Sequence, residues 1–463
     1  MGPGRRAATV RVVQQELAGA ALIDRRQAER LRRISEKVAA RPDKGLPQIF
    51  RDASQLEGAY RFFSNPRVEP AMLLGSHAEE TRRRAAGVSR IVVAHDTTEC
   101  SFGGDRKRLG RLSGKARGFL AHVALAVDGA TSMPLGVVHC EPLVRGDEPA
   151  RRTSTGVSDE TNEALRWHRG AVAVDQALPG AVQVMDREAD SYALLEEMLT
   201  RRQDFVVRLS YRDRRADGGA IETLVASAQA VAEREVSLSA RKPETAPKKM
   251  RRFPARRARK ATLAISAYRA AELLRPHTLS SKIASRIVVN VVRVVETHPP
   301  QGAEPVEWLL YTSLPVDTPE QILAVVDTYR LRWLIEEFFK ALKTGCAFEE
   351  RQLESAHALL NLLALSIPIA WQLLRLRTLA RVDPDSPGTS ILSPAQISCL
   401  RDELGPRALP PRPTARQALF AVARLGGHLA NNGDPGWLTI GRGFQELLTL
   451  ERGYLLGRRS DQS

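Results

Sequence analysis

The sequence predicts an α/β protein in which a mixed sheet with helices is interrupted by a β-rich insertion and flanked by helical segments. Beyond residue 88, apolar runs of strand length alternate with helical patterns. Asp128-Gly129 between two of these runs is a hairpin signal. The 463 residues are 43% hydrophobic and 26% charged, a globular composition that excludes a disordered or disulfide-stapled chain.

The charge balance predicts a polyanionic partner. Lys and Arg together number 69 against 53 Asp and Glu, which gives a net charge of +16. Only 11 of these basic residues are Lys, and the guanidinium groups of the 58 Arg match phosphate geometry. A GC-rich genome would explain the ratio of Arg to Lys but not the net excess of positive charge. Nucleic acid is therefore the expected partner.

The cysteines and the N-terminus predict a cytoplasmic protein. No CxxC pair occurs, which disfavours a zinc knuckle or a disulfide framework and suits a reducing compartment. The opening residues, MGPGRRAATV, lack the apolar stretch of a secretion signal. The four cysteines are Cys100, Cys140, Cys346 and Cys399.

Residues 1–70 are expected to form a helical DNA-binding domain. The segment carries 14 Arg and Lys against 8 Asp and Glu. Asp24 is placed to cap a helix that runs to Ala40 with one apolar stripe. Arginines cover the rest of this helix, and a merely solvated basic face is the alternative.

From residue 88 the pattern becomes that of an α/β layer. The predicted strand at 88–95 ends at Asp96, and the predicted strand at 181–185 ends at Asp186. Asp190 is a plausible cap for a following helix. This helix is predicted at 191–201. Further strands are predicted at 121–127, 135–140 and 205–209.

Residues 211–316 are predicted to form the β-rich insertion. Strand-like patterns cover 262–266 and 286–295. Residues 241–260 hold ten Arg and Lys and a single acid, Glu244, in a Pro-containing loop that could follow a phosphate backbone. A disordered linker is the alternative.

The last third of the chain is predicted to be mostly helical, beginning with one long helix from Pro319 to Lys343. The apolar run at 356–374 includes polar residues and Pro368, so a buried helix or helix pair is expected rather than a membrane span. An irregular Pro-rich stretch is expected at 384–413. Two apolar helices in 414–463 are expected to find little to bury against within one chain and so to mediate association.

The helix at 319–343 carries the most informative pattern. Its spacing would place five polar residues on one face, and the single acid among them, Glu336, stands amid residue types that bind phosphate. A salt-bridged surface is the alternative. The five are Tyr329, Arg332, Glu336, Lys340 and Lys343.

Glu336 would complete a set of three carboxylates with Asp96 and Asp186, gathered at a sheet edge. Three carboxylates so close would repel one another unless a cation neutralised them. Hard oxygen ligands with room for water and phosphate favour Mg²⁺ or Mn²⁺ over zinc. Two such ions would suit in-line phosphoryl transfer on nucleic acid.

Three segments resemble the motifs of bacterial DDE cut-and-paste transposases, specifically the insertion-sequence-four family. They are AHDTT at 94–98, VMDREAD at 184–190 and YRLRWLIEEFFKALKTG at 329–345. The third has the spacing of that family's Tyr, Arg, Glu and Lys. Two shorter segments resemble its N-terminal end-binding domain and its C-terminal dimerisation helices, namely EGAYRF at 57–62 and ARLGG at 423–427.

The resemblance implies a ribonuclease-H-like catalytic domain at 71–375, preceded by an end-binding domain at 1–70 and followed by a dimerisation domain at 376–463. It implies that Asp96, Asp186 and Glu336 hold two Mg²⁺ ions, with Mn²⁺ tolerated. The implied activity is strand nicking, hairpin formation, hairpin opening and strand transfer. The partners would be terminal inverted repeats, target DNA and a second copy of the chain. A catalytically inactive inhibitor of transposition is the alternative.

The resemblance also implies which residues contact DNA. Trp308 would stack on a flipped-out base during hairpin formation, with strand packing as its alternative role. The other implied contacts are Arg61, Arg208, Tyr329, Arg332, Lys340 and Lys343.

Some positions depart from the family pattern. The Lys expected two residues after Arg208 is Ser210, which leaves Arg212 as a possible substitute. An expected Trp pair is Phe119-Leu120. His122 is expected to be a core or supporting residue. The acids beside the three carboxylates, Glu188, Asp190 and Glu337, are expected to orient them.

Overall fold

The structure is a computed structural model, and it describes residues 13–104, 106–112, 116–146, 162–238, 255–429, 431 and 433–460. Residues 241–254 of the predicted basic loop lie outside these ranges. The chain forms two compact units. The first comprises Met1–Arg151, Val172–Pro179 and Trp333–Ser463, and the second comprises Arg152–Ala171 and Gly180–Arg332.

Short helices form the N-terminal part of the first unit. The Asp24 carboxylate accepts from the Arg26 backbone N–H at 2.8 Å and caps the first of them, as predicted. This helix buries one stripe that includes Leu31, Ile34 and Val38. The helices are α2 (Arg25–Ala40), α3 (Leu46–Ile49), α4 (Ala53–Ser64) and α5 (Pro70–Ala85).

An antiparallel sheet forms the centre of the first unit. Its middle strand β3 pairs on one side with β1 and on the other with β4, and the β3–β4 connection is the predicted hairpin. A short strand, β2, also pairs with β3. The strands are β1 (Ile91–Phe102), β2 (Gly110–Arg111), β3 (Arg117–Asp128) and β4 (Pro134–Leu143).

The prediction that the first strand ends at Asp96 is wrong, because β1 continues to Phe102. Residues 97–102 pair with 117–122 of β3 in unbroken register. Thr98, Cys100 and Phe102 are buried on alternate positions, so a two-residue period persists beneath a polar Asp-Thr-Thr sequence. Asp96 therefore lies within a strand.

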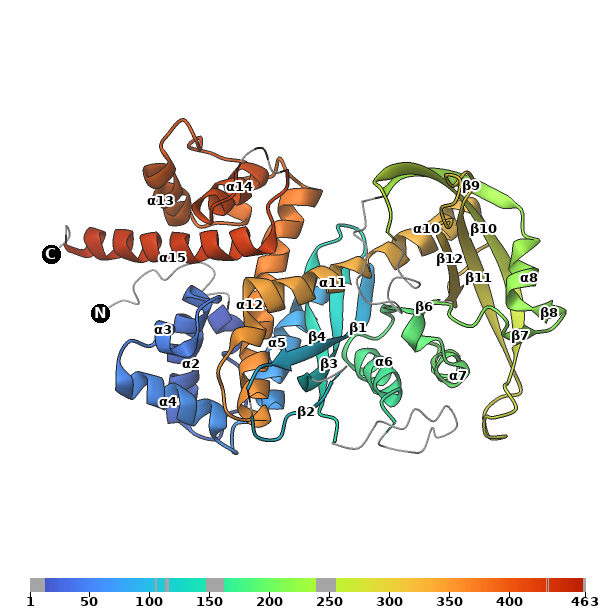
Figure 1. Ribbon diagram of the computed structural model, residues 1–463, viewed down its shortest axis with the longest axis horizontal. Helices are drawn as coiled ribbons and strands as arrows, with labels where there is room; N and C mark the ends of the chain where they lie inside the picture. The colour runs from blue at the N-terminus through green and yellow to red at the C-terminus, as the bar shows by residue number, and fades with distance from the viewer. Residues whose placement is uncertain are drawn as a thin grey trace. The chain divides into compact units, whose positions relative to one another are not determined.

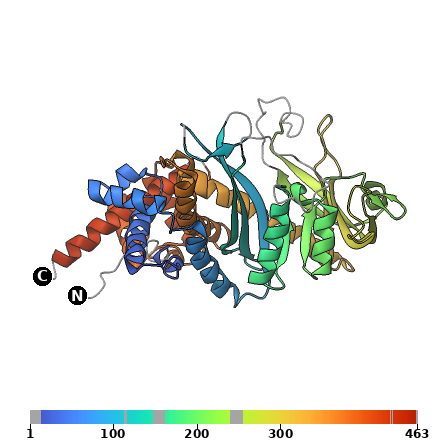
Figure 2. The same cartoon turned by 90° about the horizontal axis from the view of Figure 1, so that it is seen from below.

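Helix α12 (Ala356–Val382) is the central helix of the first unit and packs against α2, α4, α5 and β4. Figures 1 and 2 both show it, in orange, beside the blue N-terminal helices. It contains Pro368, and its buried Asn361 donates to the Phe63 and Val68 carbonyls at 2.9 and 2.8 Å. Of the described helices it alone is long and apolar enough to cross a membrane, yet 89% of its apolar window is buried. The predicted buried helix is confirmed.

The C-terminal region differs from its prediction in two ways. Residues 384–413 include helix α13 (Pro394–Leu404), which begins at a capping box formed by Ser393 and Gln396. Helices α14 (Ala415–Leu425) and α15 (Trp437–Ser460) pack against each other, and α14 packs against α12. They bury many of their apolar residues within the chain, so the expectation that they find little to bury against is wrong.

The second unit contains a mixed sheet. Strand β5 runs parallel to β6, which pairs antiparallel with β12, and the order continues through β11 and β10. The predicted β-rich insertion thus joins this sheet through β12. The strands are β5 (Val182–Met185), β6 (Phe205–Arg208), β7 (Arg215–Ala216), β8 (Gly219–Ala220), β9 (Ala230–Leu238), β10 (Arg259–Leu274), β11 (Arg286–Glu296) and β12 (Glu307–Thr312).

Helices cover the sheet of the second unit. Helix α10 (Pro319–Arg330) packs against β5, β6, β9, β10 and β11, and α8 (Ile221–Ala226) lies against β10 and β11 (Figure 1). Helix α7 (Tyr192–Thr200) contributes Leu194, Leu195 and Met198 to the apolar core of the unit. Helix α6 (Leu165–Ala177) begins in the second unit and ends in the first.

The predicted continuous helix from Pro319 to Lys343 is divided, so the prediction of one helical face is wrong. Helix α10 ends at Arg330, a turn follows, and α11 (Trp333–Lys340) is continued by a π-helix at Ala341–Gly345. At the turn the Leu331 and Arg332 N–H groups donate to carbonyls three residues earlier, at 3.2 and 3.1 Å. This tighter hydrogen bonding interrupts the four-residue ladder, and the boundary between the units falls there.

Candidate active site

Asp96 and Glu336 both lie in the first unit, on elements that pack together. Asp96 is on β1 and Glu336 on α11, and α11 packs against β1. Both residues are partly buried. The Thr97 N–H donates to Asp96 Oδ1 at 2.7 Å, and the Thr97 hydroxyl lies 3.0 Å from Nδ1 of the buried His122. His122 therefore supports the strand that carries Asp96, as expected.

Lys343, predicted to bind phosphate, makes contacts with other residues of the chain. Its ammonium donates to the Glu99 carbonyl of β1 and lies 3.4 Å from the Glu349 carboxylate. Glu349 in turn accepts from the Ser101 N–H at 2.8 Å. These contacts fasten the end of the Glu336 helix to the strand of Asp96.

Lys340 and Glu337 form a second set of contacts around α11. Lys340 donates to Glu337 at 2.8 Å, and Glu337 also pairs with Arg377 of α12 and accepts from the Trp437 indole N–H of α15 at 3.1 Å. Burial raises the pKa of Glu337, but the hydrogen bonds and nearby positive charges outweigh burial and hold it below its ordinary value. Glu337 thus joins the helices around α11.

Asp186 lies in the second unit directly after β5, where the sequence predicted it. Its Oδ1 accepts from the Glu188 N–H at 2.9 Å and caps the short 3₁₀ turn at Arg187–Ala189. The carboxylate is partly buried. Glu188 forms an ion pair with Arg166 at 2.6 Å.

The proposed capping role of Asp190 is wrong, because Ser191 is the N-cap of α7. Asp190 is buried, forms an ion pair with the buried Arg214, and accepts from the Ser210 and Tyr211 N–H groups at 2.6 and 2.9 Å. A carboxylate surrounded by donors is stable in the interior. Asp190 therefore holds the backbone that follows β6 in place through these hydrogen bonds.

The donor chemistry of the three predicted carboxylates fits a hard divalent cation, since each is an oxygen ligand and none is fully buried. Asp96 and Glu336 belong to the first unit and Asp186 to the second. Over the described ranges, no three His, Cys, Asp or Glu side chains are gathered as a metal site.

Four predicted DNA contacts come together in the second unit. The Trp308 ring packs edge-on against the Tyr329 ring at 5.4 Å between centroids. The Arg208 guanidinium lies 5.9 Å from the Trp308 ring, and the Arg332 guanidinium lies 5.9 Å from the Tyr329 ring. Tyr329 is 4% exposed, and no described group hydrogen-bonds its hydroxyl. We name Arg208, Trp308, Tyr329 and Arg332 the aromatic–arginine cluster.

Two other predicted contacts lie apart from this cluster. Arg61 is on α4, with its side chain 72% exposed, and pairs with Glu57 one turn earlier. Arg212, the possible substitute for the missing Lys, forms ion pairs with Glu222 and Glu307 at 2.6 Å each. Its charge is therefore neutralised by neighbouring carboxylates.

Sequence reasoning missed Trp333, at the start of α11. The side chain is 56% exposed, and the Lys340 ammonium lies 5.5 Å from its ring. A large exposed aromatic beside a cation is suited to nucleic acid. Its position three residues before Glu336 places both on neighbouring parts of one helix surface, which is the signal that could have identified it.

Comparison with known families identifies the class of protein. A family model described as the transposase DDE domain matches residues 89–369, more than half of the chain. A second model, described as transposase DNA-binding, matches residues 11–68. The chain belongs to the family of DDE-domain transposases, and its catalytic domain is ribonuclease-H-like.

A solved structure is also similar in part. It is a cryo-EM structure of the piggyBac transposase synaptic complex with hairpin DNA, 10% identical in sequence. The match covers 81% of this chain and 73% of that chain, with a TM-score of 0.36.

Proposed function

We propose that this DDE transposase moves a DNA element by cut-and-paste. The steps are nicking at the element's end, attack by the freed 3′-hydroxyl to form a hairpin, hydrolytic opening of the hairpin, and joining of the end to target DNA. The observation that carries the proposal is the aromatic–arginine cluster, because four residues chosen from three separate motifs as DNA contacts lie together. The narrower likeness to the insertion-sequence-four family, and to the transposase of transposon five within it, rests on the motif at 329–345.

We assign Asp96, Asp186 and Glu336 as the residues that would hold Mg²⁺ or Mn²⁺, as two ions. When bound, such ions activate a water or hydroxyl and stabilise the leaving oxygen of phosphoryl transfer. Arg208 and Arg332 present forked donors that match phosphate. Trp308 offers an aromatic face to a base, and the buried Tyr329 ring packs edge-on against it.

The domain roles follow from the same proposal. Residues 1–70 bind the terminal inverted repeats, 71–375 catalyse, and 376–463 contribute to a homodimer assembled on DNA. Within α15 the buried side chains that the structure describes end at Glu451, and Gly453 beyond it is exposed. We propose that α15 contacts the second copy at this position, Gly453.

The first prediction tests the assignment of the acids. Asp96→Asn, Asp186→Asn and Glu336→Gln should each abolish cleavage of end DNA and leave end binding nearly unchanged, because affinity comes mainly from Arg and Lys. Nicking of a labelled duplex carrying the inverted repeat that flanks the gene, beside a gel-shift assay, measures both properties.

Asp327→Asn is the matched control, since Asp327 is a half-exposed carboxylate of α10 paired with Arg234. It should cleave normally. Near-normal cleavage by any of the three test variants would remove that residue from the site. If the unaltered protein binds the duplex and never cuts it, the alternative of an inactive inhibitor is correct.

A further inference from the structure

Arg351 is a buried guanidinium that joins two distant parts of the first unit. The residue is 1% exposed. It donates to the Pro42 and Lys44 carbonyls, in the turn between α2 and α3, and to the Cys346 carbonyl at 2.9 Å. Arg is seldom buried this completely, and burial lowers the pKa of Arg351. The carbonyl acceptors compensate the loss of hydration.

The Cys346 end of this bridge lies at the end of the helix that carries Glu336. Cys346 terminates the π-helix that continues α11, and its N–H donates to the Ala341 carbonyl at 2.9 Å. The same π-helix contains Lys343, which is fastened to the Asp96 strand through Glu99. A π-helical turn is rare and is frequently found at functional sites. Arg351 is one of the groups that holds it.

The other end of the bridge lies in the DNA-binding segment, since Pro42 and Lys44 fall within the matched residues 11–68. We propose that Arg351 is a positioning residue that couples this segment to the Glu336 helix. When the segment binds an end, the turn at 42–44 is held, and Arg351 transmits that restraint to the π-helix and so to Glu336 and Lys343. This inference rests on the proposed function.

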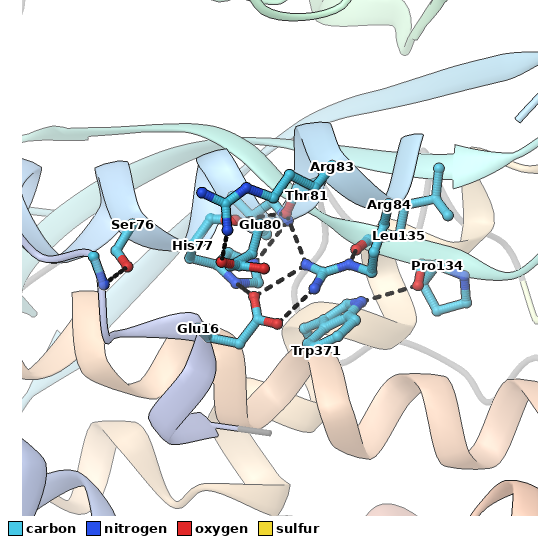
Figure 3. A network of polar contacts seen from close by, with 12 residues as sticks. Glu16, Ser76, His77, Glu80, Thr81, Arg83, Arg84, Pro134, Leu135 and Trp371 are labelled. Carbon is cyan, nitrogen blue, oxygen red and sulfur yellow. Dashed lines mark hydrogen bonds and ion pairs between the residues drawn. The ribbon is translucent and has the colours of Figure 1, made fainter. Parts of the chain in front are cut away.

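A second buried anchor of the same segment provides a control (Figure 3). Glu16 is 2% exposed, accepts from His77 at 2.6 Å and forms an ion pair with Arg84 at 2.5 Å. Arg84 also donates to the Leu135 carbonyl at 2.6 Å and lies 4.1 Å from the Trp371 ring. Glu16 thus fastens the DNA-binding segment to α5, β4 and α12 through contacts that do not include α11.

The experiment compares Arg351→Lys with Glu16→Gln in the full chain. Lysine keeps the charge but cannot present forked donors to three carbonyls. Both variants should lower the melting temperature, and both should bind the inverted-repeat duplex within threefold of the unaltered protein. Only Arg351→Lys should slow single-turnover nicking per bound molecule, by tenfold or more, and spread the cuts over neighbouring positions.

The inference is overturned if the two variants lose nicking in parallel with stability, or if Arg351→Lys nicks normally. Hydrogen exchange in the unaltered protein gives a test that needs no variant and no cleavage. Amides of residues 341–346 should exchange at least threefold more slowly with the inverted-repeat duplex than with a scrambled duplex, and equal exchange would contradict the coupling. Absence of nicking by the unaltered protein contradicts the proposed function alone.

Discussion

The two adjacent glutamates of α11 have different surroundings. This difference gives Glu337 a structural role and leaves Glu336 as the residue proposed to hold the metal. Glu337 is buried and held by Lys340, Arg377 and Trp437, whereas Glu336 is only partly buried. Glu337→Gln should lower the free energy of unfolding by about 1–3 kcal/mol, because the partly buried charge of Arg377 loses its ion-pair partner. Thermal melting measures this loss.

The pH dependence of the same variant gives its control. The folded pKa of Glu337 lies below the ordinary value of 4.5. The stabilisation is therefore complete above the unfolded pKa and is lost as the pH falls through the lower folded pKa. Below about pH 4.5 the melting temperature of Glu337→Gln should fall less steeply than that of the unaltered protein. If the melting temperatures of both proteins fall equally with pH, the ionised Glu337 carboxylate does not stabilise the fold.

Trp308 permits a prediction about hairpin formation. Unstacking a terminal base costs a few kcal/mol, and stacking on an aromatic face returns about 1–3 kcal/mol. Trp308→Ala should therefore leave the first nick nearly unchanged and slow the later steps by about one to two orders of magnitude. Trp308→Phe should recover part of the loss. A denaturing gel of labelled end DNA should show nicked strands accumulating.

The alternative for Trp308 follows from its packing against Tyr329. If nick and hairpin decline together with the melting temperature in Trp308→Ala, the residue serves packing alone.

Residue-scale features were predictable where a local pattern determines them. An apolar strand ending in an acid located Asp186, and a capping pattern located Asp24. Asp96 was misplaced relative to its strand, because the polar Asp-Thr-Thr concealed alternate burial that depends on β3. Pairing of Asp190 with Arg214, 24 residues away, depends on tertiary packing and has no local signal.

At the scale of elements, glycines determine how α14 and α15 approach each other. A Cβ at Gly426 would overlap the Thr439 carbonyl, and a Cβ at Gly443 would overlap the Val422 carbonyl. The ARLGG segment, which resembles a dimerisation motif, therefore serves close packing within the chain. Both helices were predictable from their apolar periodicity, but their contact was not.

Two glycines of α15 give a matched prediction. Nothing lies within 4 Å of a Cβ at Gly453, and Ala is favoured over Gly in a helix by about 1 kcal/mol, so Gly453→Ala should raise the melting temperature. Gly443→Ala should lower the free energy of unfolding by about 1–3 kcal/mol through overpacking. Thermal denaturation of both variants checks the prediction. Destabilisation by Gly453→Ala would show that its site is occupied, as it would be in a dimer.

Helix division shows where sequence periodicity fails. The residues from Tyr329 to Lys343 keep a helical spacing, yet the hydrogen bonds at Leu331 and Arg332 shorten to three residues. The amino acids at the turn are not helix breakers, so no composition signal marks it. Conversely, Ser393 and Gln396 form a capping signal for α13 that the surrounding prolines obscured.

At the scale of the whole molecule, motif order along the chain does not correspond to the division into units. Asp96 and Glu336, 240 positions apart in the printed sequence, share the first unit, while Asp186 between them belongs to the second. The sequence predicted the class of fold, because strands and helices leave periodic patterns of apolar residues. It could not predict the units, since chain connectivity alone does not specify which strands pair.

The contacts of α12 also set an order of events during synthesis. Asn361 donates to the carbonyl of Phe63, which leaves the ribosome 298 residues earlier. At about 5–20 residues per second, this interval lasts roughly 15–60 seconds. The apolar surface of the N-terminal helices therefore remains uncovered until α12 has been synthesised. Such distant contacts slow folding and expose the nascent chain to aggregation. A chain terminated before α12 would lack the central helix of the first unit.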